Sequence, residues 1–420
     1  MYKVIIMIKS FIDTDRGVSI IPRELYQDKI KPYMGQRLVK VLTGQRRTGK
    51  SFLLYQLMNE LIKQDPSAHV IYINKEDMAF DAIRTAQDLD AYIKKETRSG
   101  TRNYVFIDEI QDIRDFEKAV RSLLLDPMYD VYCTGSNASL LSSDLASLLS
   151  GRFIEIRVYG LSYTEFLQFN QLENTQDNLM EYLKVGGLPH IHCLPDREEV
   201  RTEYLMNLLH TILYKDIVGR FGIRNVRFLD QLVHFLAGHC GSIFSAKSIS
   251  DFLKSQHIRM APNQVQVYVD HLCSAYLVSR SERYDVAGKR VFEFGEKYYF
   301  EDLGLRNSVV GYKPGDLNQL IENAVFNHLK ICGYEVKTGQ LGRSEIDFIG
   351  EKDHEILYIQ ATAQLDSPET IAREFGNLLN IPDNHPKWVV SMDPQFSNTY
   401  EGIRHVNLKE FLSNPVRMRD

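Results

Sequence analysis

The sequence contains 420 residues, which is too long for a single hydrophobic core, so we expect two to four domains. Hydrophobic residues make up 44% and charged residues 25%, as in an ordinary soluble globular protein. With 50 basic against 55 acidic side chains, the net charge of −5 gives no overall positive field. Nucleic-acid binding would therefore require a local basic patch.

The cysteines and the apolar runs indicate a protein of a reducing compartment. The five cysteines include no Cys-x-x-Cys pair, which argues against a disulfide framework and against zinc. The apolar opening at residues 4–8 is too short for a signal peptide, and Lys9 interrupts it. No apolar run approaches the length of a membrane span. We expect a cytoplasmic protein without a membrane partner.

In chain order, residues 1–38 lead to a phosphate-binding loop. An apolar run at residues 39–42 breaks at Gly44, and Gly49 precedes Lys50 and Ser51 before an apolar helical pattern. This is G-x-x-x-x-G-K-[ST] between a strand and a helix, whose backbone N–H groups point at phosphate oxygens. The alternative is an ordinary glycine-containing turn. The residues expected to bind nucleotide are Gly44, Gln45, Arg46, Arg47, Thr48, Gly49, Lys50, Ser51 and Phe52.

Two carboxylates end the third predicted strand. Residues 68–74 predict a buried parallel strand, and residues 104–110 predict another after a polar helix. Asp108 and Glu109 follow four apolar residues in the Walker B pattern, at the carboxyl end where parallel strands bind nucleotide. We expect Lys50 to bridge the β- and γ-phosphates, Ser51 and Asp108 to hold Mg²⁺, and Glu109 to polarise water. The alternative is that the two carboxylates cap a loop.

Two further residues follow predicted strands. Asn137 follows the strand at 129–136, where it would contact the γ-phosphate or the attacking water as a sensor. The alternative is that Asn137 caps the next helix. Arg152 precedes the strand at 153–158 and would complete a neighbouring subunit's site as an arginine finger. The alternative is that it pairs with a surface carboxylate.

Several motifs together resemble one family. They are residues 43–51 (TGQRRTGKS), 107–111 (IDEIQ), 134–138 (TGSNA), 150–152 (SGR), 161–166 (LSYTEF) and 186–189 (GGLP). From about Ile20 to near the C-terminus, the chain resembles the prokaryotic AAA-type ATPases, related to the archaeal ATPases, that carry a C-terminal domain of unassigned function. The resemblance implies ATP and Mg²⁺ as ligands. In wider relatives the proline of a Gly-x-Pro turn touches adenine, which implies Pro189 as a base contact; a rigid interhelical turn explains the same residues.

Residues 160–225 predict a helical lid, and residues 226–300 predict a winged helix. The latter pattern is three helices, near 227–239, 245–254 and from 263, and then a hairpin of 277–283 with 290–294. In DNA-binding winged helices the third helix enters the major groove. Here its exposed positions carry no Lys or Arg, and the basic residues lie in the wing. The interpretation as a DNA reader and the interpretation as a protein-contact domain both remain open. The wing residues are Arg280, Arg283, Lys289 and Arg290.

The order of elements beyond residue 311 resembles the PD-(D/E)xK nuclease core. Asp347 fits the first carboxylate, and Glu322 fits the glutamate of the preceding helix. On the third strand, however, Gln360 and Thr362 stand where the nuclease pattern needs Glu and Lys. A threonine cannot carry a positive charge, although Lys337 on a neighbouring strand could supply one. We therefore expect a nuclease-like fold without nuclease activity.

The sequence predicts an α/β protein with a P-loop NTPase parallel sheet and helical lid, then a winged-helix domain and a small α/β nuclease-like domain. The expected boundaries are 1–160 for the ATPase core, 161–225 for the lid, 226–310 for the winged helix and 311–420 for the nuclease-like domain. The expected function is an ATP-binding and ATP-hydrolysing switch or motor. Its partner is DNA, through the wing or the C-terminal domain, or a protein, and homo-oligomerisation stays open. The alternatives are an ATP-regulated metal-dependent nuclease and a nucleotide-gated interaction module with negligible turnover.

Overall fold

The computed structural model describes residues 21–138, 149, 151–393 and 398–416, apart from the side chains of residues 292–294. The apolar opening at residues 4–8 and Ser150 of the SGR motif lie outside the described residues. The chain divides into two compact units, Met1–Tyr159 and Gly160–Asp420, which are considered separately. Within the described part of the chain, the helices are too short or too polar to cross a membrane.

The first unit is built on a five-stranded sheet in which every pairing is parallel. The strand order β2-β3-β4-β1-β5 puts β4 at the centre and β1 between β4 and the edge strand β5. The strands are nearly continuous apolar runs, as expected when both faces of a parallel sheet are buried. They are β1 (Val39–Thr43), β2 (His69–Asn74), β3 (Asn103–Asp108), β4 (Tyr129–Gly135) and β5 (Phe153–Arg157).

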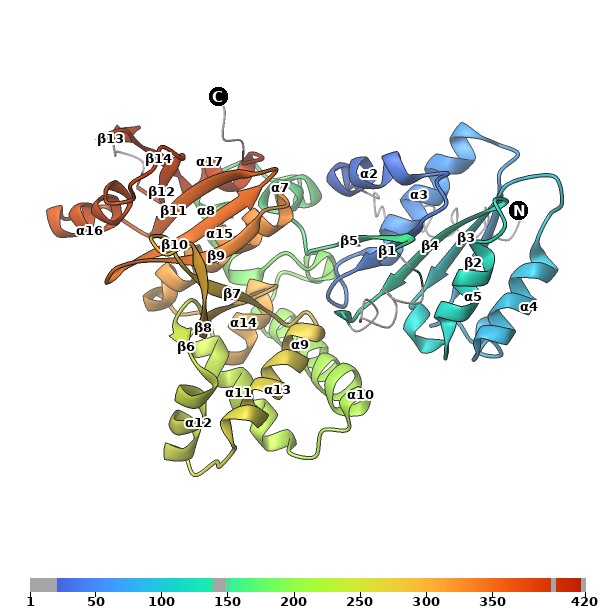
Figure 1. Cartoon of the computed structure of the whole chain (residues 1–420), viewed down its shortest axis with the longest axis horizontal. Helices are drawn as coiled ribbons and strands as arrows, with labels where there is room; N and C mark the ends of the chain where they lie inside the picture. Colours follow the sequence, from blue (N-terminus) through green and yellow to red (C-terminus); the bar gives the residue numbers. More distant parts are fainter. Residues whose placement is uncertain (1–20, 139–148, 150, 394–397, 417–420) are drawn as a thin grey trace. The chain divides into compact units, whose positions relative to one another are not determined.

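Helices cover both faces of this sheet. One face packs against α2 and α3 around Tyr26, Leu54 and Met58, and the other packs against α4 and α5 around Leu89 and Val120. Figure 1 shows α3 and α5 on opposite sides of the strands. The helices are α2 (Glu24–Ile30), α3 (Lys50–Gln64), α4 (Ala86–Glu96) and α5 (Phe116–Leu123), with 3₁₀ turns η1 (Lys31–Tyr33), η2 (Met78–Phe80) and η3 (Ile110–Asp112).

A buried ion pair joins the central strand β4 to its neighbour β1. The Lys40 ammonium on β1 pairs with the Asp130 carboxylate on β4, and both side chains are fully buried. The second carboxylate oxygen of Asp130 accepts the Gly35 N–H at 2.8 Å and the Tyr132 hydroxyl at 2.9 Å. Burial lowers the pKa of Lys40 despite the adjacent carboxylate, so the charge of the ammonium depends on Asp130.

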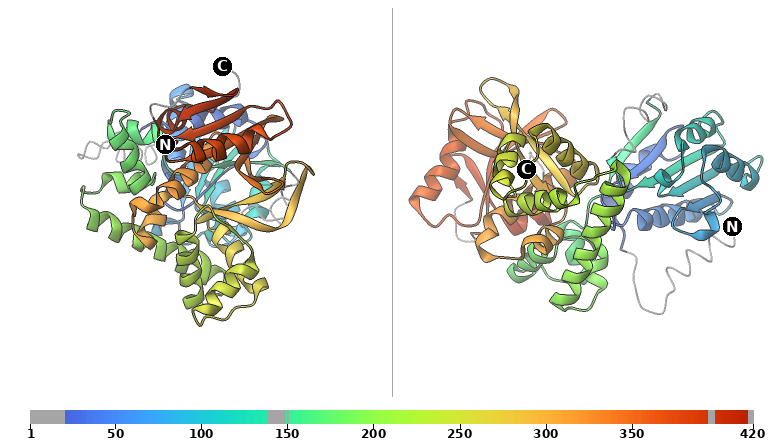
Figure 2. Two further views of the ribbon diagram at one scale, coloured as in Figure 1. Left: turned by 90° about the vertical axis from the view of Figure 1, so that its left-hand side faces the viewer. Right: turned by 90° about the horizontal axis from the view of Figure 1, so that it is seen from below.

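The second unit contains one nine-stranded mixed sheet of order β13-β14-β12-β11-β10-β9-β7-β8-β6. Strands β9, β10 and β11 are antiparallel, β11, β12 and β14 are parallel, and the hairpin β7–β8 joins the sheet through a parallel pairing of β7 with β9. The left view of Figure 2 shows this yellow hairpin extending from the orange strands. The strands are β6 (Ile243–Phe244), β7 (Val278–Asp285), β8 (Arg290–Phe300), β9 (Glu335–Leu341), β10 (Ser344–Lys352), β11 (Glu355–Thr362), β12 (Lys387–Ser391), β13 (Thr399–Tyr400) and β14 (Ile403–Asn407).

Three apolar cores hold the second unit together. Helices α15, α17, α7 and α8 pack on one face of the sheet around Phe326 and Phe348, and α16 packs on the other face through Phe375. A third core joins α9, α11, α12 and α13 to the hairpin. The helices are α7 (Tyr163–Asn170), α8 (Gln176–Val185), α9 (Glu198–Thr211), α10 (Gly219–Phe221), α11 (Val226–Gly238), α12 (Ala246–Ser255), α13 (Pro262–Ser274), α14 (Leu303–Val310), α15 (Leu317–Ile331), α16 (Pro368–Leu379) and α17 (Leu408–Ser413), with η5 (Pro189–Cys193), the π-helix η6 (Ile212–Val218) and η7 (Pro314–Asp316).

The elements follow the predicted order closely. The parallel α/β core with helices and the further mixed sheet confirm the expected fold class. Helices α11, α12 and α13 and the hairpin β7–β8 stand in the order expected of a winged helix. The sheet, however, runs across the predicted boundary between residues 310 and 311, because β7 pairs with β9. The division of the second unit into domains stays a prediction.

The Lys40–Asp130 pair generates a stability prediction. Asp130→Ala should lower the free energy of unfolding by about 3–5 kcal/mol, because it leaves a buried ammonium without its carboxylate. Asp28→Ala is the control, since it removes an ion pair with Lys31 in which both side chains are about half or more exposed; its effect should stay within about 1 kcal/mol. Urea denaturation of the full chain measures both, and equal effects would contradict the prediction.

Candidate functional site

The loop between β1 and α3 requires glycine at both ends. Gly44 has φ +142°, and a Cβ at this position would lie 2.1 Å from the carbonyl oxygen of Val158. Gly49, at the N-cap of α3, has φ +94°. L side chains rarely adopt these conformations, so the two glycines allow the backbone to curl immediately before the helix N-terminus. The predicted phosphate-binding loop therefore has the local shape that an anion cradle needs.

Contacts within the first unit hold this loop in place. The Lys50 ammonium donates to the carbonyl oxygens of Gly44 at 2.9 Å and Gln45 at 2.7 Å. Arg23, which is buried, donates to the carbonyl oxygens of Thr48 and Tyr159, each at 2.9 Å. Lys50 therefore lies against the inside of the loop, and Arg23 fixes the loop from the other side.

Asp108 ends β3 beside the start of α3. Its carboxylate accepts hydrogen bonds from the hydroxyls of Thr134 and Ser51, and from the Tyr72 hydroxyl at 3.3 Å. The parallel pairing of β2, β3 and β4 brings Tyr72 and Thr134 to Asp108. Ser51 and Asp108, predicted separately as ligands of Mg²⁺, are thus adjacent and hydrogen-bonded.

Glu109 lies one residue further along and has a left-handed backbone, with φ +56°. Its N–H donates to the Thr134 hydroxyl at 2.9 Å, and its carboxylate accepts the Ser136 hydroxyl at 3.1 Å and the Gln111 amide. A non-glycine residue in this conformation is held by its surroundings and is typical of functional positions. Thr134 therefore holds the Glu109 backbone, and Gln111 and Ser136 fix the direction of its carboxylate.

The pKa values of the two adjacent carboxyl groups shift in opposite directions. Burial raises the pKa of Asp108 by more than the hydrogen bonds from Thr134 and Ser51 lower it. Burial acts on Glu109 in the same direction, but the Lys50 charge and the hydrogen bond from Gln111 bring the pKa of Glu109 below its ordinary value. Paired groups with diverging pKa values are a mark of acid–base chemistry. Of the two, Glu109 is the one whose ionised form its surroundings favour.

The donors present fit a nucleotide and a hard metal ion. The Gln45 side chain is only 2% exposed, and neither its amide oxygen nor its amide nitrogen has a hydrogen-bond partner within the described part of the chain. A buried amide in that state is costly unless a bound group completes its hydrogen bonds. The hydroxyl of Ser51 and the carboxylate of Asp108 are oxygen donors of the kind that Mg²⁺ prefers.

The remaining predicted site residues lie at different distances from this centre. Asn137 is fully buried directly after β4, at the same edge of the sheet as Asp108. Arg152 is exposed and precedes β5, which runs parallel to β1 in the register Val39↔Phe153. It therefore lies at the amino edge of the sheet, roughly 16 Å along the strands from the loop. Within its own unit Arg152 is not brought to the site, and only an action on another subunit stays a prediction.

Four further residues were predicted as nucleotide contacts. Arg46 is half-buried and contributes its charge to lowering the pKa of Glu109, whereas Arg47 is exposed with φ +66°. Phe52 is 44% exposed on the first turn of α3. Pro189 belongs to the second unit, where it begins η5 after the Gly-Gly-Leu turn, and its contact with the base stays a prediction.

Sequence reasoning missed several side chains that arrange this centre. Three of these residues could have been found from motifs already described. Gln111 belongs to the IDEIQ motif, and Thr134 and Ser136 belong to the TGSNA motif. Arg23 gave no signal, since its contacts are with backbone carbonyls far along the chain. Arg157 was also missed: it ends β5 opposite Thr43, so it lies at the carboxyl edge that Arg152 does not reach.

The second unit contains another charged centre, around Lys297 on β8. Its ammonium lies 2.6 Å from a Glu322 carboxylate oxygen, 2.6 Å from one of Glu345 and 3.5 Å from one of Asp347. The Tyr299 hydroxyl also donates to Glu322, at 2.7 Å. The Lys297 side chain is 3% exposed, so the ammonium is buried among three carboxylates. These are the positions at which the nuclease resemblance implies a metal.

The residues of this centre do not fit a metal ion. The Gln360 amide accepts the Asp347 N–H at 2.7 Å and donates to Glu374 at 2.9 Å, so both its ends are used within the protein. Asp347 accepts the Ala361 N–H at 3.0 Å and faces the ammonium with its other oxygen. Burial and the Glu322 charge raise the pKa of Asp347 to about 8. No group of three His, Cys, Asp or Glu side chains suited to a metal exists within the described residues.

The lysine of this centre comes from an unexpected strand. Lys337, which the sequence suggested as the source of the positive charge, pairs instead with Glu351 at 3.8 Å. Its ammonium lies over the Tyr284 ring, 5.5 Å from the ring centre. Lys297 was missed because it belongs to the hairpin assigned to the winged helix, 50 residues before Asp347. The pairing of β7 with β9 brings that hairpin into the sheet that contains β10.

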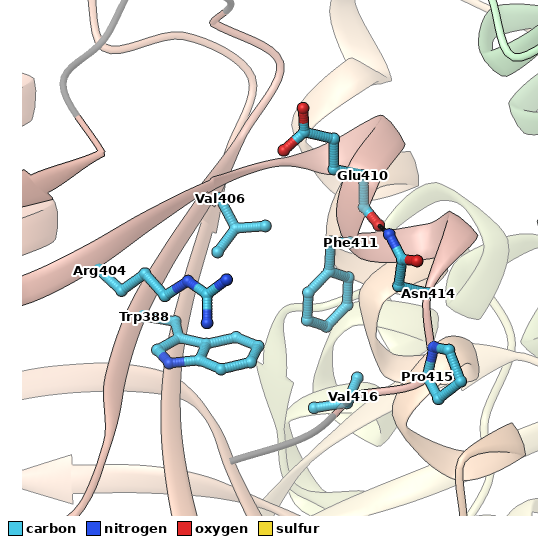
Figure 3. A pocket seen from close by; sticks show the side chains of 8 residues that line it. All are labelled: Trp388, Arg404, Val406, Glu410, Phe411, Asn414, Pro415 and Val416. Carbon is cyan, nitrogen blue, oxygen red and sulfur yellow. Dashed lines mark hydrogen bonds between the residues drawn. The ribbon is translucent and has the colours of Figure 1, made fainter. Parts of the chain in front are cut away.

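Two of the cavities lined by described residues lie in the second unit. One, of about 340 Å³, lies between β12, β14 and α17; Figure 3 shows Arg404 over the Trp388 indole, opposite Phe411. The guanidinium carbon is 5.0 Å from the indole ring. The other cavity, of about 410 Å³, lies between α12 and α13 and has three basic residues in its lining.

Two family models match separate segments of the sequence. The family model of an AAA domain matches residues 36–167, and that of a domain of unknown function, DUF8612, matches residues 176–316. An uncharacterised protein of Haemophilus influenzae is 34% identical over 400 residues, which cover 94% of this chain and 99% of that protein. An uncharacterised protein of Methanocaldococcus jannaschii is 28% identical over 337 residues, which cover 76% of this chain and 71% of that protein.

A solved structure shares the fold. The Walker-type ATPase PABY2304 of Pyrococcus abyssi superposes with a TM-score of 0.51 at 15% sequence identity. The superposition covers 71% of this chain and 97% of that one. At this identity the likeness concerns the fold alone.

The Lys297 centre predicts a large cost for losing the ammonium. Lys297→Met should lower the free energy of unfolding by about 3–5 kcal/mol, because it leaves Glu322 and Asp347 buried without a counter-charge. Lys337→Met is the matched control, since its pair with Glu351 is partly exposed; its effect should stay within about 1 kcal/mol. Thermal and urea unfolding of the full chain measure both, and a well-tolerated Lys297→Met would contradict the prediction.

Proposed function

This chain belongs to the AAA-type P-loop ATPases that carry a C-terminal domain of unknown function, and from that membership we propose that it binds ATP with Mg²⁺, hydrolyses it and uses the cycle as a switch or motor on a macromolecular partner. The observation that supports this best is the pair of adjacent carboxylates beside the glycine loop. Asp108 is hydrogen-bonded to Ser51, while Glu109 has a lowered pKa and is held by hydrogen bonds with three side chains.

The loop residues bind the phosphates in this proposal. The N–H groups between Gly44 and Gly49 and the N-terminus of α3 supply a positive field for the anion. Lys50 exchanges its two carbonyl partners for β- and γ-phosphate oxygens, which are stronger acceptors for an ammonium. Ser51 and Asp108 would hold Mg²⁺, which neutralises the charge on the β- and γ-phosphates.

Glu109 orients the attacking water. Its ionised carboxylate accepts a hydrogen bond from that water, and Ser136 and Gln111 keep the carboxylate directed at it. Asn137, buried at the same edge, contacts the γ-phosphate or the water. Arg152 acts on the site of a neighbouring subunit, and Pro189 contacts the base.

The second unit carries the output, toward DNA or toward a protein. The rival in which nucleotide only gates an interaction differs from this proposal in turnover, because its binding would be tight but phosphate release negligible. The rival in which the chain is a metal-dependent nuclease is disfavoured by the use of Lys297, Gln360 and Asp347 in contacts within the protein.

Two substitutions test hydrolysis. Lys50→Ala should lower both nucleotide affinity and turnover, the latter by about two orders of magnitude or more, because it removes a charge that stabilises the transition state. Glu109→Gln should leave ATP binding intact and lower turnover to a similar extent, because a neutral amide cannot polarise the water. Phosphate release and the binding of a fluorescent ATP analogue measure the two effects.

Matched controls lie on neighbouring helices. Lys63→Ala, on the exposed end of α3, and Glu96→Gln, on the exposed end of α4, should leave both quantities unchanged. Turnover that survives in Glu109→Gln would rule out its proposed role. Tight ATP binding by the unmodified protein without phosphate release would favour the gated module and reject hydrolysis.

A separate assay tests the nuclease alternative. Incubation with supercoiled plasmid and Mg²⁺ or Mn²⁺ should give no nicking, because the ammonium of Lys297 lies where a metal would have to bind. Cleavage that Asp347→Asn abolishes while ATP hydrolysis persists would overturn this expectation. The same plasmid with a restriction enzyme serves as the positive control.

A further inference from the structure

The cavity of about 410 Å³ in the second unit lies at the corner between α12 and α13. Most of its lining residues are polar or charged, and they come from α12, from the turn at residues 256–261 and from the start of α13. They are Lys247, Ser250, Asp251, Lys254, Arg259, Met260, Ala261, Pro262 and Gln264.

Three cations converge on this cavity against one carboxylate. Lys247, Lys254 and Arg259 are exposed, and their side chains have no ion pair or hydrogen bond within the part of the chain that the structure describes. Asp251 also lines the cavity and is the only acidic residue in its lining. The corner is therefore locally basic on a chain whose net charge is −5. A local patch of this kind is what nucleic-acid binding requires of an acidic protein.

The corner holds its shape through fixed contacts. The Ser250 hydroxyl, which is buried, donates to the Met260 carbonyl at 2.6 Å and so fixes the turn that carries Arg259. Beneath the turn, Leu253 and Val265 are buried in the core that joins the helices. The charged groups thus project from a rigid base and lose little backbone entropy on binding.

The spacing of these groups matches a DNA backbone. Lys247 and Lys254 are seven residues apart and share one face of α12, about 10.5 Å apart along its axis. Successive nucleotides of one strand rise by about 3.4 Å, so the two lysines span about three steps. Beside them, Asn263 and Gln264 are exposed at the start of α13. Uncharged amides there can hydrogen-bond base edges or phosphates, while cations on the preceding helix contact the backbone.

The arginines of the wing, in contrast, pair with other residues of the protein. Arg280 pairs with Asp270 and lies 3.8 Å from Glu296. Arg283 donates to the Gln340 amide at 3.0 Å, and Arg290 lies 3.6 Å from Asp285. A phosphate would have to compete with these partners for the arginines of the wing. Within the described residues, no such competition arises for the cations of the α12–α13 corner.

We propose that α12 and its turn into α13 bind the backbone of duplex DNA through Lys247, Lys254 and Arg259, with Asn263 and Gln264 directed at the groove. This inference identifies the macromolecular partner that the proposed function leaves open. It rests on the proposed function only where ATP is concerned. DNA binding itself requires no hydrolysis. An acidic protein surface is the competing partner, and neither the axial spacing of the lysines nor the amide pair beside them is explained by it.

The test compares two variants of the full chain. Lys247→Gln/Lys254→Gln/Arg259→Gln removes the corner charges, and Lys289→Gln/Arg290→Gln removes two exposed charges of the wing. Fluorescence anisotropy with a short labelled duplex gives the dissociation constant at several salt concentrations, in the absence of nucleotide. The corner variant should bind at least about tenfold more weakly, and its slope of log K against log salt should fall by about 2.7, since three phosphate contacts are lost. The wing variant should change the affinity less than twofold.

Each outcome decides the question. Equal losses in both variants, DNA binding unchanged by the corner substitutions, or no binding to the duplex would overturn the proposal. Loss of binding to polyglutamate in place of DNA would assign the corner to an acidic protein and also overturn it. Circular dichroism confirms folding of the exposed-residue variants. Phosphate release without DNA should be unchanged in both variants, so a failure of DNA binding is distinguished from a failure of ATP hydrolysis.

Discussion

The parallel alignment of β1, β3 and β4 is the constraint on which the nucleotide site depends. Because the three strands run in one direction and in fixed register, the glycine loop, the Asp108–Glu109 pair and the Thr134–Asn137 segment all reach one edge of the sheet. The Lys40–Asp130 pair secures β1 to β4 in the sheet interior. Each functional segment is unremarkable alone, and the site arises from their shared edge.

Three lysines are buried among the described residues, and their partners separate their roles. Lys40 and Lys297 contact carboxylates, which bind an ammonium more strongly than neutral acceptors do. Lys50 contacts two backbone carbonyls, which a phosphate can replace with a gain in electrostatic energy. Lys50 is thus suited to a ligand, since backbone carbonyls accept its hydrogen bonds while its charge also acts on Glu109, whereas the other two lysines form ion pairs within the protein. Burial alone would not distinguish them.

The sequence could predict what local pattern encodes. The glycine loop, the end of β3 and the order of helices and strands follow from short runs of residues, and they agree with the structure. What depends on pairing between distant strands was not predictable. The partners of Glu109 come from β4, Lys40 meets a carboxylate 90 residues away, and Lys297 comes from a hairpin assigned to another domain. The third strand offers no lysine, and the one that does lie beside Asp347 comes from β8, beyond β9 and β7 in the strand order.

The position of Lys297 has a consequence for how the second unit folds. Its three carboxylate partners, at positions 322, 345 and 347, all lie beyond the predicted boundary at residue 310. Until α15 and β10 have formed, the hairpin carries an ammonium whose burial nothing offsets. The hairpin and the α/β elements after it therefore gain their stability together, in one cooperative transition of high contact order. A truncation after residue 310 would separate a cation from its counter-ions, so we expect the two recognisable patterns of the second unit to fold together.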